Sequence, residues 1–189
     1  MKKVLMLAVA AMAFAIPATA SAADFTHNGT AIEHGKSVSV SFTGPAAFSL
    51  TAAPANGVHC PQIHASLKIE ATGTGTVTTF TGTECTNTPQ SLTVDTIALG
   101  LPWTVHAIPA LNKIQITGVH INNKVTLGGN VVGESTLQGS ITAIVNNSEA
   151  ITTATLDDEG ATVEIEGTKF QMDVTGDISP QGSTQIGLE

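Results

Sequence analysis

Apolar and polar residues alternate with a period of two through most of this chain, and this feature constrains its fold more than any other. Val38, Val40 and Phe42 alternate with polar residues, as do Val163 and Ile165. Thr occurs 28 times, and β-branched residues lose rotamer freedom in helices but pack well on a pleated sheet. Strands with one apolar and one polar face are typical of antiparallel sheets.

Turn-forming residues separate the alternating segments. Asn122-Asn123 lies between two of them, and because Asn tolerates a positive φ, this pair predicts a two-residue hairpin. Residues 157–160, Asp-Asp-Glu-Gly, predict a second hairpin, Gly167 a third reversal and residues 146–148 a fourth. Short strands at this spacing are typical of a β-sandwich.

The expected fold is therefore all-β: a single antiparallel β-sandwich, jelly-roll-like, with about ten to twelve short strands. Beyond the N-terminal segment no stretch has a convincing helical period, and none has the composition of a domain linker. Phe42, Phe80 and Phe170 are expected on the apolar faces of strands. One domain is predicted over residues 23–189, long enough to bury a substantial core.

The segment 1–22 has the pattern of a secretory signal peptide. Lys2 and Lys3 precede an apolar run over 4–16, Pro17 breaks the run, and Ala-Ser-Ala at 20–22 supplies the small residues that signal peptidase requires. The run is too short for a transmembrane helix. We expect a cleaved signal helix, no integral membrane segment after cleavage, and a secreted protein that is extracellular, on the cell surface, or periplasmic in a Gram-negative cell.

The charge of the chain excludes several partners. It has fifteen acidic residues, seven lysines and no arginine, and without the two lysines of the signal the net charge is −10 with His neutral. Nucleic acids and anionic membrane surfaces need clustered Lys and Arg. Neither is an expected partner, and the kind of extracellular or surface partner is left open.

Cys60 and Cys85 are the only cysteines. An isolated even pair in an exported chain predicts one disulfide, which would close a loop of 24 intervening residues. The chain-entropy treatment assigns such a loop about 3–3.5 kcal/mol. The alternative is a metal site, because His59 and His64 flank Cys60.

No catalytic pattern is present in the sequence. The chain lacks a Gly-x-Ser-x-Gly elbow, and no spacing of Ser, His and Asp singles out a triad. Neither H-E-x-x-H nor H-x-H occurs, and His106 and His120 would face each other only if the strand from Trp103 pairs with the strand that ends at Ile121. The prediction is a non-enzymatic protein with no catalytic residues and no cofactor.

The candidate calcium ligands are Asp157, Asp158 and Glu159, which precede Gly160 at a predicted loop tip. Consecutive side chains point apart, and the acid spacing of an EF-hand loop is missing. A solvated hairpin tip accounts for the same residues, so no metal site is predicted.

The stretch Gly100, Leu101, Pro102 and Trp103 holds the only Trp of the chain. Leu101 precedes Pro and is expected to be extended, and Pro102 suits the start of a strand because it has no N–H. Trp103 and Val105 would then share one apolar face. We predict a structural motif with a buried indole. The alternative is a stacking site for a ligand, although a single aromatic residue is too little for a sugar platform.

This pattern resembles that of a group of small secreted bacterial β proteins, common in actinobacteria and mostly uncharacterised, and more distantly that of the secreted alkane-oxidation activator proteins of pseudomonads. The matching positions are Cys60, Cys85, 100–104, 117–118, His120 and 178–180. The chain lacks the further cysteine pair that many of these proteins have in their second half, so at most one bridge forms. The resemblance implies a secreted β-sandwich with hydrocarbon- or surface-related biology, and it supplies no catalytic residues.

Two functions are compatible with these features. The first is a secreted, non-enzymatic structural or interaction protein of the cell surface or extracellular matrix. The alternative is a binding protein that holds a small apolar ligand or a divalent cation between its sheets. A core filled completely by the apolar positions favours the first function, and a lined cavity favours the second.

Overall fold

The computed structural model describes residues 25–148, 151–157, 161–182 and 184–188. The predicted signal peptide, residues 1–22, lies outside the described residues. Within the described ranges the chain forms fourteen strands and one 3-10 turn. These are β1 (Phe25–His27), β2 (Thr30–Ala31), β3 (Ser37–Leu50), β4 (Ala53–Glu70), β5 (Thr74–Thr83), β6 (Thr86–Thr88), β7 (Thr93–Ala98), β8 (Trp103–Ile108), η1 (Pro109–Leu111), β9 (Lys113–Leu127), β10 (Asn130–Ser148), β11 (Ile151–Asp157), β12 (Ala161–Ile165), β13 (Thr168–Pro180) and β14 (Ile186–Leu188).

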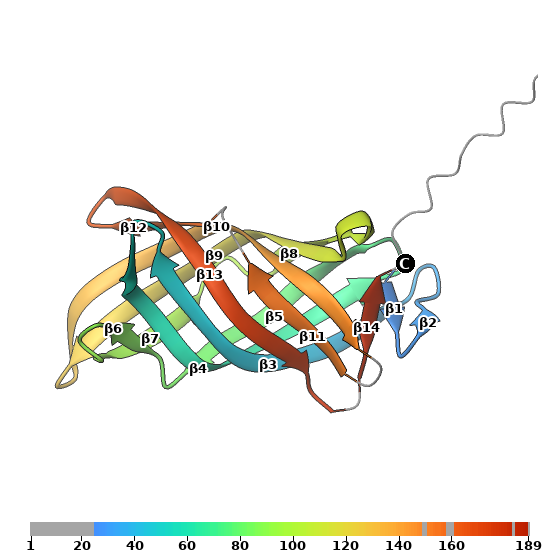
Figure 1. Cartoon of the computed structure of the whole chain (residues 1–189), viewed down its shortest axis with the longest axis horizontal. Coiled ribbons are helices and arrows are strands. Elements are labelled where there is room, and N and C mark those ends of the chain that lie inside the picture. Colours follow the sequence, from blue (N-terminus) through green and yellow to red (C-terminus); the bar gives the residue numbers. More distant parts are fainter. Residues whose placement is uncertain (1–24, 149–150, 158–160, 183, 189) are drawn as a thin grey trace, which may run out of the picture.

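The large antiparallel sheet closes on itself. In one half of this sheet the pairing order is β3–β4–β5–β8–β9–β10–β11–β13, and β13 in turn pairs with β3, which closes the sheet. In the other half, β6 and β7 take the places of β5 and β8, and β12 takes the place of β11. Figure 1 shows the long strands β3, β4, β9, β10 and β13 running along the whole molecule. The predicted all-β, sandwich-like fold is confirmed, and strand pairing joins its opposing layers.

The predicted hairpin at Asn122-Asn123 is wrong, because β9 continues through both residues. The chain instead reverses at Gly128 and Gly129, whose φ angles are 59° and 83°. A two-residue turn that fits the twist of its strands needs a positive φ at both positions, and glycine adopts it without steric cost. The asparagine pair therefore remains inside the sheet.

The predicted hairpin over 157–160 is also wrong. In the described residues β11 and β12 pair with the same neighbours, β10 and β13, and not with each other. Thr142 of β10 pairs with Asp157, and Gln138 pairs with Thr162. β11 and β12 therefore pair with successive stretches of β10, one in each half of the sheet.

The remaining predicted reversals lie at or near their expected positions. The reversal at Gly167 is confirmed, since Glu166 and Gly167 join β12 to β13 with φ angles of 49° and 79°. The fourth follows the predicted residues 146–148, because β10 ends at Ser148 and pairs there with Ile151. Its two connecting residues lie outside the described ranges.

A small sheet covers one end of the closed sheet. It has the order β14–β1–β2, and Figure 1 places it beyond the ends of the long strands. Its residues Phe25 and Ile186 are 0% and 2% exposed, and Ile32, which follows β2, is 7% exposed. The opposite end is bordered by the β9–β10 and β12–β13 hairpins. This arrangement leaves the two ends of the molecule unequal.

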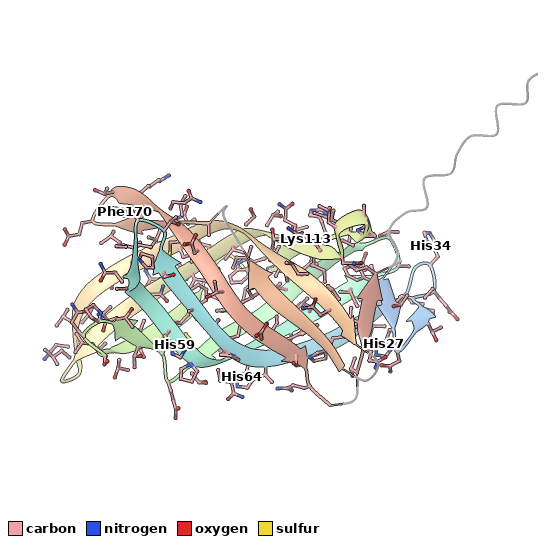
Figure 2. The ribbon with its side chains drawn as sticks, viewed as in Figure 1. His27, His34, His59, His64, Lys113 and Phe170 are labelled. Atoms are coloured by element: carbon pink, nitrogen blue, oxygen red, sulfur yellow. A yellow bond between two sulfur atoms is a disulfide. The ribbon has the colours of Figure 1, made fainter. Side chains whose placement is uncertain are left out.

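The predicted core positions Phe42 and Phe80 are buried. Phe170 is not, with 39% of its surface exposed. It has the same strand parity as Met172 and Val174, which are both buried. Its exposure arises because it lies next to the β12–β13 turn, at the end of the molecule away from the small sheet (Figure 2).

Candidate ligand-binding cavity

The predicted disulfide between Cys60 and Cys85 is confirmed. It joins β4 to the residue before β6, and both cysteines are buried. Gly82 of β5 makes room for it, because a Cβ at this position would lie 2.6 Å from the Cys85 sulfur. Since Cys60 is bonded to Cys85, the alternative of a metal site with His59 and His64 is wrong.

The other candidate metal ligands are not brought together. β8 and β9 do pair, but His106 lies opposite Gln115 and not opposite His120. The hypothesis that the two histidines face each other is therefore wrong. Figure 2 shows the labelled histidines on separate parts of the surface. In the part of the chain that the structure describes, no group of three His, Cys, Asp or Glu residues is arranged to hold a metal ion. Asp158 and Glu159 lie outside the described residues, and Asp157 is placed only by its backbone at the end of β11.

The indole of Trp103 is buried, as predicted, with 3% of its surface exposed. Gly100, Leu101 and Pro102 lead into β8, which begins at Trp103. The indole Nε1 donates a hydrogen bond to the carbonyl oxygen of Leu99 at 2.9 Å. This bond satisfies the one polar atom of the side chain, so the ring can lie in wholly apolar surroundings.

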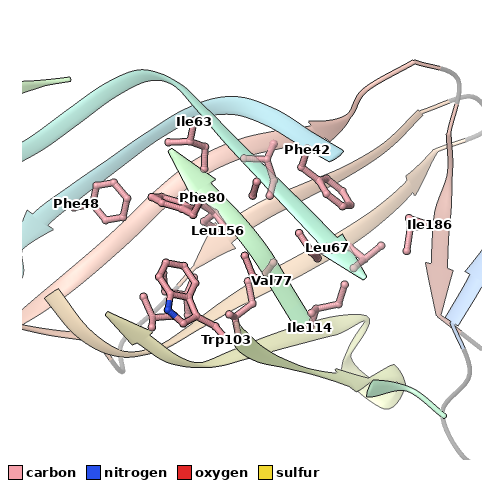
Figure 3. A pocket seen from close by; sticks show the side chains of 17 residues that line it. Phe42, Phe48, Ile63, Leu67, Val77, Phe80, Trp103, Ile114, Leu156 and Ile186 are labelled. Atoms are coloured by element: carbon pink, nitrogen blue, oxygen red, sulfur yellow. The ribbon is translucent and has the colours of Figure 1, made fainter. Parts of the chain in front are cut away.

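Trp103 also lines a cavity of about 50 Å³ between the layers of the sheet (Figure 3). All 17 lining residues are apolar. They are Phe42, Phe48, Ile63, Ala65, Leu67, Val77, Phe80, Trp103, Ile114, Ile116, Val119, Ile141, Ala143, Val145, Leu156, Ile178 and Ile186. The core is therefore incompletely filled, and the side chain predicted to anchor it is also part of a cavity wall.

The shape of the cavity follows from the strands around it. Phe48 and Ile186 lie at opposite ends of its lining in Figure 3. Ile186 belongs to the small sheet that covers one end of the molecule. The rings of Phe80 and Trp103 approach each other with centroids 5.4 Å apart. The cavity is thus an apolar space with aromatic groups on its wall and a covered inner end.

A second hollow, of about 220 Å³, lies in the half of the sheet built with β6, β7 and β12. We call it the mouth. Its lining residues are Phe48, Leu50, Asn56, Gly57, Val58, Asn87, Thr88, Asn123, Val125, Gly133, Glu134, Ser135, Val163, Ile165 and Met172. Apolar side chains are joined here by several amides and hydroxyls, and no Lys or His is among them.

Asn123 is the most deeply placed polar residue of the mouth, with 2% of its surface exposed. Its Oδ1 accepts a hydrogen bond from the Thr96 hydroxyl at 3.1 Å. The Thr96 oxygen in turn lies 4.0 Å from the Cys60 sulfur. The disulfide, Thr96 and Asn123 thus form one buried group that fixes the amide in the mouth.

Sequence reasoning did not identify Asn123 or Phe48 as site residues. Asn123 was predicted in a turn, and the residue pair Asn-Asn gives no sign that one member is buried. Phe48 is one of several phenylalanines on alternating segments. The positions of both relative to the cavity depend on long-range register, which local sequence patterns do not specify.

No family model, curated protein or solved structure matches this chain. The resemblance to small secreted bacterial β proteins therefore remains a prediction. Among the described residues, no helix has the length and apolar character needed to cross a membrane.

Proposed function

We propose that the protein is a non-enzymatic binding protein that holds a small apolar molecule between the layers of its sheet. The observation that carries this proposal is the cavity lined by apolar side chains alone. Ligand sites are typically concave and mostly apolar, with few polar groups. A core filled completely would favour a purely structural role, and this core has a cavity beside its only indole.

The chemistry of the lining supports binding rather than catalysis. An enzyme needs a nucleophile, an acid or a base within reach of its substrate. The cavity wall consists of Phe, Trp, Ile, Leu, Val and Ala. Such a wall stabilises a ligand by removing apolar surface from water, at about 25 cal/mol per Å² of ligand surface buried.

The size of the cavity favours a narrow ligand. A cavity that binds benzene has a volume of about 150 Å³, and a water molecule needs about 10–15 Å³ together with polar partners. The observed volume of about 50 Å³ lies between these values. We therefore propose an unbranched hydrocarbon chain, with one part in the cavity and the remainder in the larger mouth.

The same proposal includes export from the cell. The sequence pattern of residues 1–22 is that of a signal peptide, and the Cys60–Cys85 disulfide is the kind of bond that persists in oxidising compartments. Mass spectrometry of protein recovered from the culture medium or the cell envelope tests this part. A mature chain that begins at Ala23 is expected, and recovery of the unprocessed chain in the cytoplasm alone would refute it.

Trp103 supplies the test of binding, because it is the only Trp and lies in the cavity wall. Bromohexane is titrated into the folded protein while indole emission is recorded. Since bromine quenches an indole that it contacts, we expect saturable quenching. Hexane, added as a competitor, should restore the emission.

A pair of alanine substitutions controls this experiment. Ala143 lines the cavity and is buried, whereas Ala110 of η1 is exposed. Ala143→Val should fill part of the cavity and lower the affinity about tenfold or more, and Ala110→Val should leave it unchanged. Circular dichroism verifies that both variants are folded. Linear, unsaturable quenching of the wild-type protein would overturn the proposed function.

A second candidate function is an interaction through the tip of the β9–β10 hairpin. Leu127, Val131 and Val132 are 58%, 53% and 55% exposed, and clustered exposed apolar residues often mark contact surfaces. This observation favours the expected surface or matrix role. Sedimentation of the wild-type protein and of Leu127→Ser/Val131→Ser tests it, because self-association through the tip should be lost in the variant. A monomeric wild-type protein that also binds no envelope or matrix fraction would refute the second candidate.

A further inference from the structure

The cavity and the mouth adjoin at a single side chain. Among the described residues, Phe48 is the only one that lines both spaces. Its side chain is 2% exposed, and its backbone pairs with Val58 of β4 and Val174 of β13. A ligand that occupies both spaces would therefore contact the Phe48 ring.

Asn123 leaves hydrogen-bond donors available in the mouth. Its Oδ1 is bonded to Thr96, but among the described residues its Nδ2 makes no hydrogen bond. This nitrogen is also absent from the fully buried polar atoms that have no partner. It therefore retains accessible surface, and because Asn123 lines the mouth, the two N–H groups are open to an acceptor there.

The charges around the mouth exclude an anionic acceptor. Glu134 lines the mouth, and its carboxylate lies 3.7 Å from the Lys124 ammonium, so this cation is already paired. No Lys and no His belongs to the described lining. A ligand carboxylate would lose its hydration without gaining a counter-charge, which is costly, whereas a neutral carbonyl oxygen needs only a hydrogen-bond donor.

We infer that Asn123 binds the neutral carbonyl oxygen of the ligand in the mouth while the ligand's hydrocarbon chain runs past Phe48 into the cavity. The ligand class is a single-chain ester or ketone. This inference rests on the proposed function and adds a polar head to the ligand. The buried Thr96 hydroxyl positions the amide, so its N–H groups are already oriented before the ligand binds.

Three competitors of similar length test the head group: methyl hexanoate, hexanoate and nonane. Each is added to protein whose Trp103 emission has been quenched by bromohexane. Methyl hexanoate should displace bromohexane about tenfold more effectively than hexanoate, and about tenfold more effectively than nonane once the difference in their transfer free energies from water to alkane is subtracted, as expected for one additional hydrogen bond. No ester advantage in either comparison, with bromohexane still binding saturably, would overturn this inference and leave the proposed function intact.

Two neighbouring asparagines provide a matched pair of variants. Asn123→Leu should abolish the advantage of the ester while bromohexane still binds. Asn122→Leu should keep the advantage, because Asn122 follows the opposite strand parity and does not line the mouth. An ester advantage that persists in Asn123→Leu would show that another group binds the carbonyl, and the inference would then be wrong.

Asn123→Val guards against a variant that fails to fold. Valine is smaller than leucine and suits a β-strand, and it removes both N–H groups without placing a charge in the buried site. It should lose the ester preference and retain the competition by nonane. If the wild-type protein shows no saturable quenching at all, the proposed function itself fails, which is distinct from the failure of the head-group preference.

Discussion

Apolar side chains at the two ends of the molecule are buried to very different extents. In the small sheet at one end, Phe25 and Ile186 are 0% and 2% exposed, whereas at the opposite end Phe170 is 39% exposed, and Leu50 and Ile165, which line the mouth, are half-buried. The difference is that β14–β1–β2 covers only one end. Strand parity decides which way a side chain faces, but burial also requires another element to cover it. In the function proposed above, the uncovered end is where a ligand would reach the interior.

The strongest test of this comparison replaces one phenylalanine at each end. Phe25→Ala should lower the free energy of unfolding by about 3–5 kcal/mol, because a fully buried ring is lost and a hole remains. Phe170→Ala should change it by less than about 1 kcal/mol, since much of the ring already contacts water. Urea denaturation of both variants measures the difference. Equal losses would mean that Phe170 is covered in solution and that the ends do not differ as described.

The disulfide provides the next largest effect, and it acts on the mouth half. Cys60→Ala/Cys85→Ala should destabilise the protein by about 3 kcal/mol, according to the chain-entropy treatment of the loop. Because the bridge ties β4 to the start of β6, hydrogen exchange should accelerate more in β6 and β7 than in β5 and β8. Uniform acceleration in all four strands would show that the bridge does not act locally. Alkylation of the unreduced wild-type protein should detect no free thiol.

The alternation of apolar and polar residues was sufficient to predict the fold class, because the side of the sheet that a strand residue faces depends only on its position within that strand. Val38, Val40 and Phe42 show the period of two, and they lie in β3 as expected. The length of the strands was not predictable in the same way. The sheet closes through pairings between segments that are distant in the sequence, such as β13 with β3. No local pattern in the sequence indicates which strands make these closing pairs.

The turn residues show why the site was missed. Both Asn122-Asn123 and Gly128-Gly129 are turn signals a few residues apart, and only one can be the hairpin. The glycine pair forms it, and Asn123 then lies within the strand at a position that faces the mouth. Trp103 was predicted to be buried from its strand parity, but whether the space beside it is filled depends on side chains from nine strands.

A smaller effect is expected from the hydroxyl that holds Asn123. Thr96→Val keeps the shape of the side chain but leaves the amide oxygen without its donor, at a cost of about 1–2 kcal/mol. Thr104→Val on the exposed face of β8 is the matched control and should cost less than about 0.5 kcal/mol. Urea denaturation compares the two. A Thr96→Val variant as stable as the control would mean that the buried polar group does not stabilise the mouth half.

The smallest effect concerns the connection between β11 and β12, where the covered half of the sheet meets the mouth half. Asp157, Asp158 and Glu159 are consecutive, so their carboxylates are not spaced as in known calcium loops. We expect 5 mM Ca²⁺ to raise the melting temperature by less than about 1 °C. Extracellular calcium sites bind with Kd values of about 0.1–1 mM. Such a site would add about 1–2 kcal/mol at this concentration and raise the melting temperature by several degrees. A rise of that size, lost in Asp157→Ala/Asp158→Ala but kept in Glu33→Ala, would place a calcium site at the junction of the two halves and reverse this prediction.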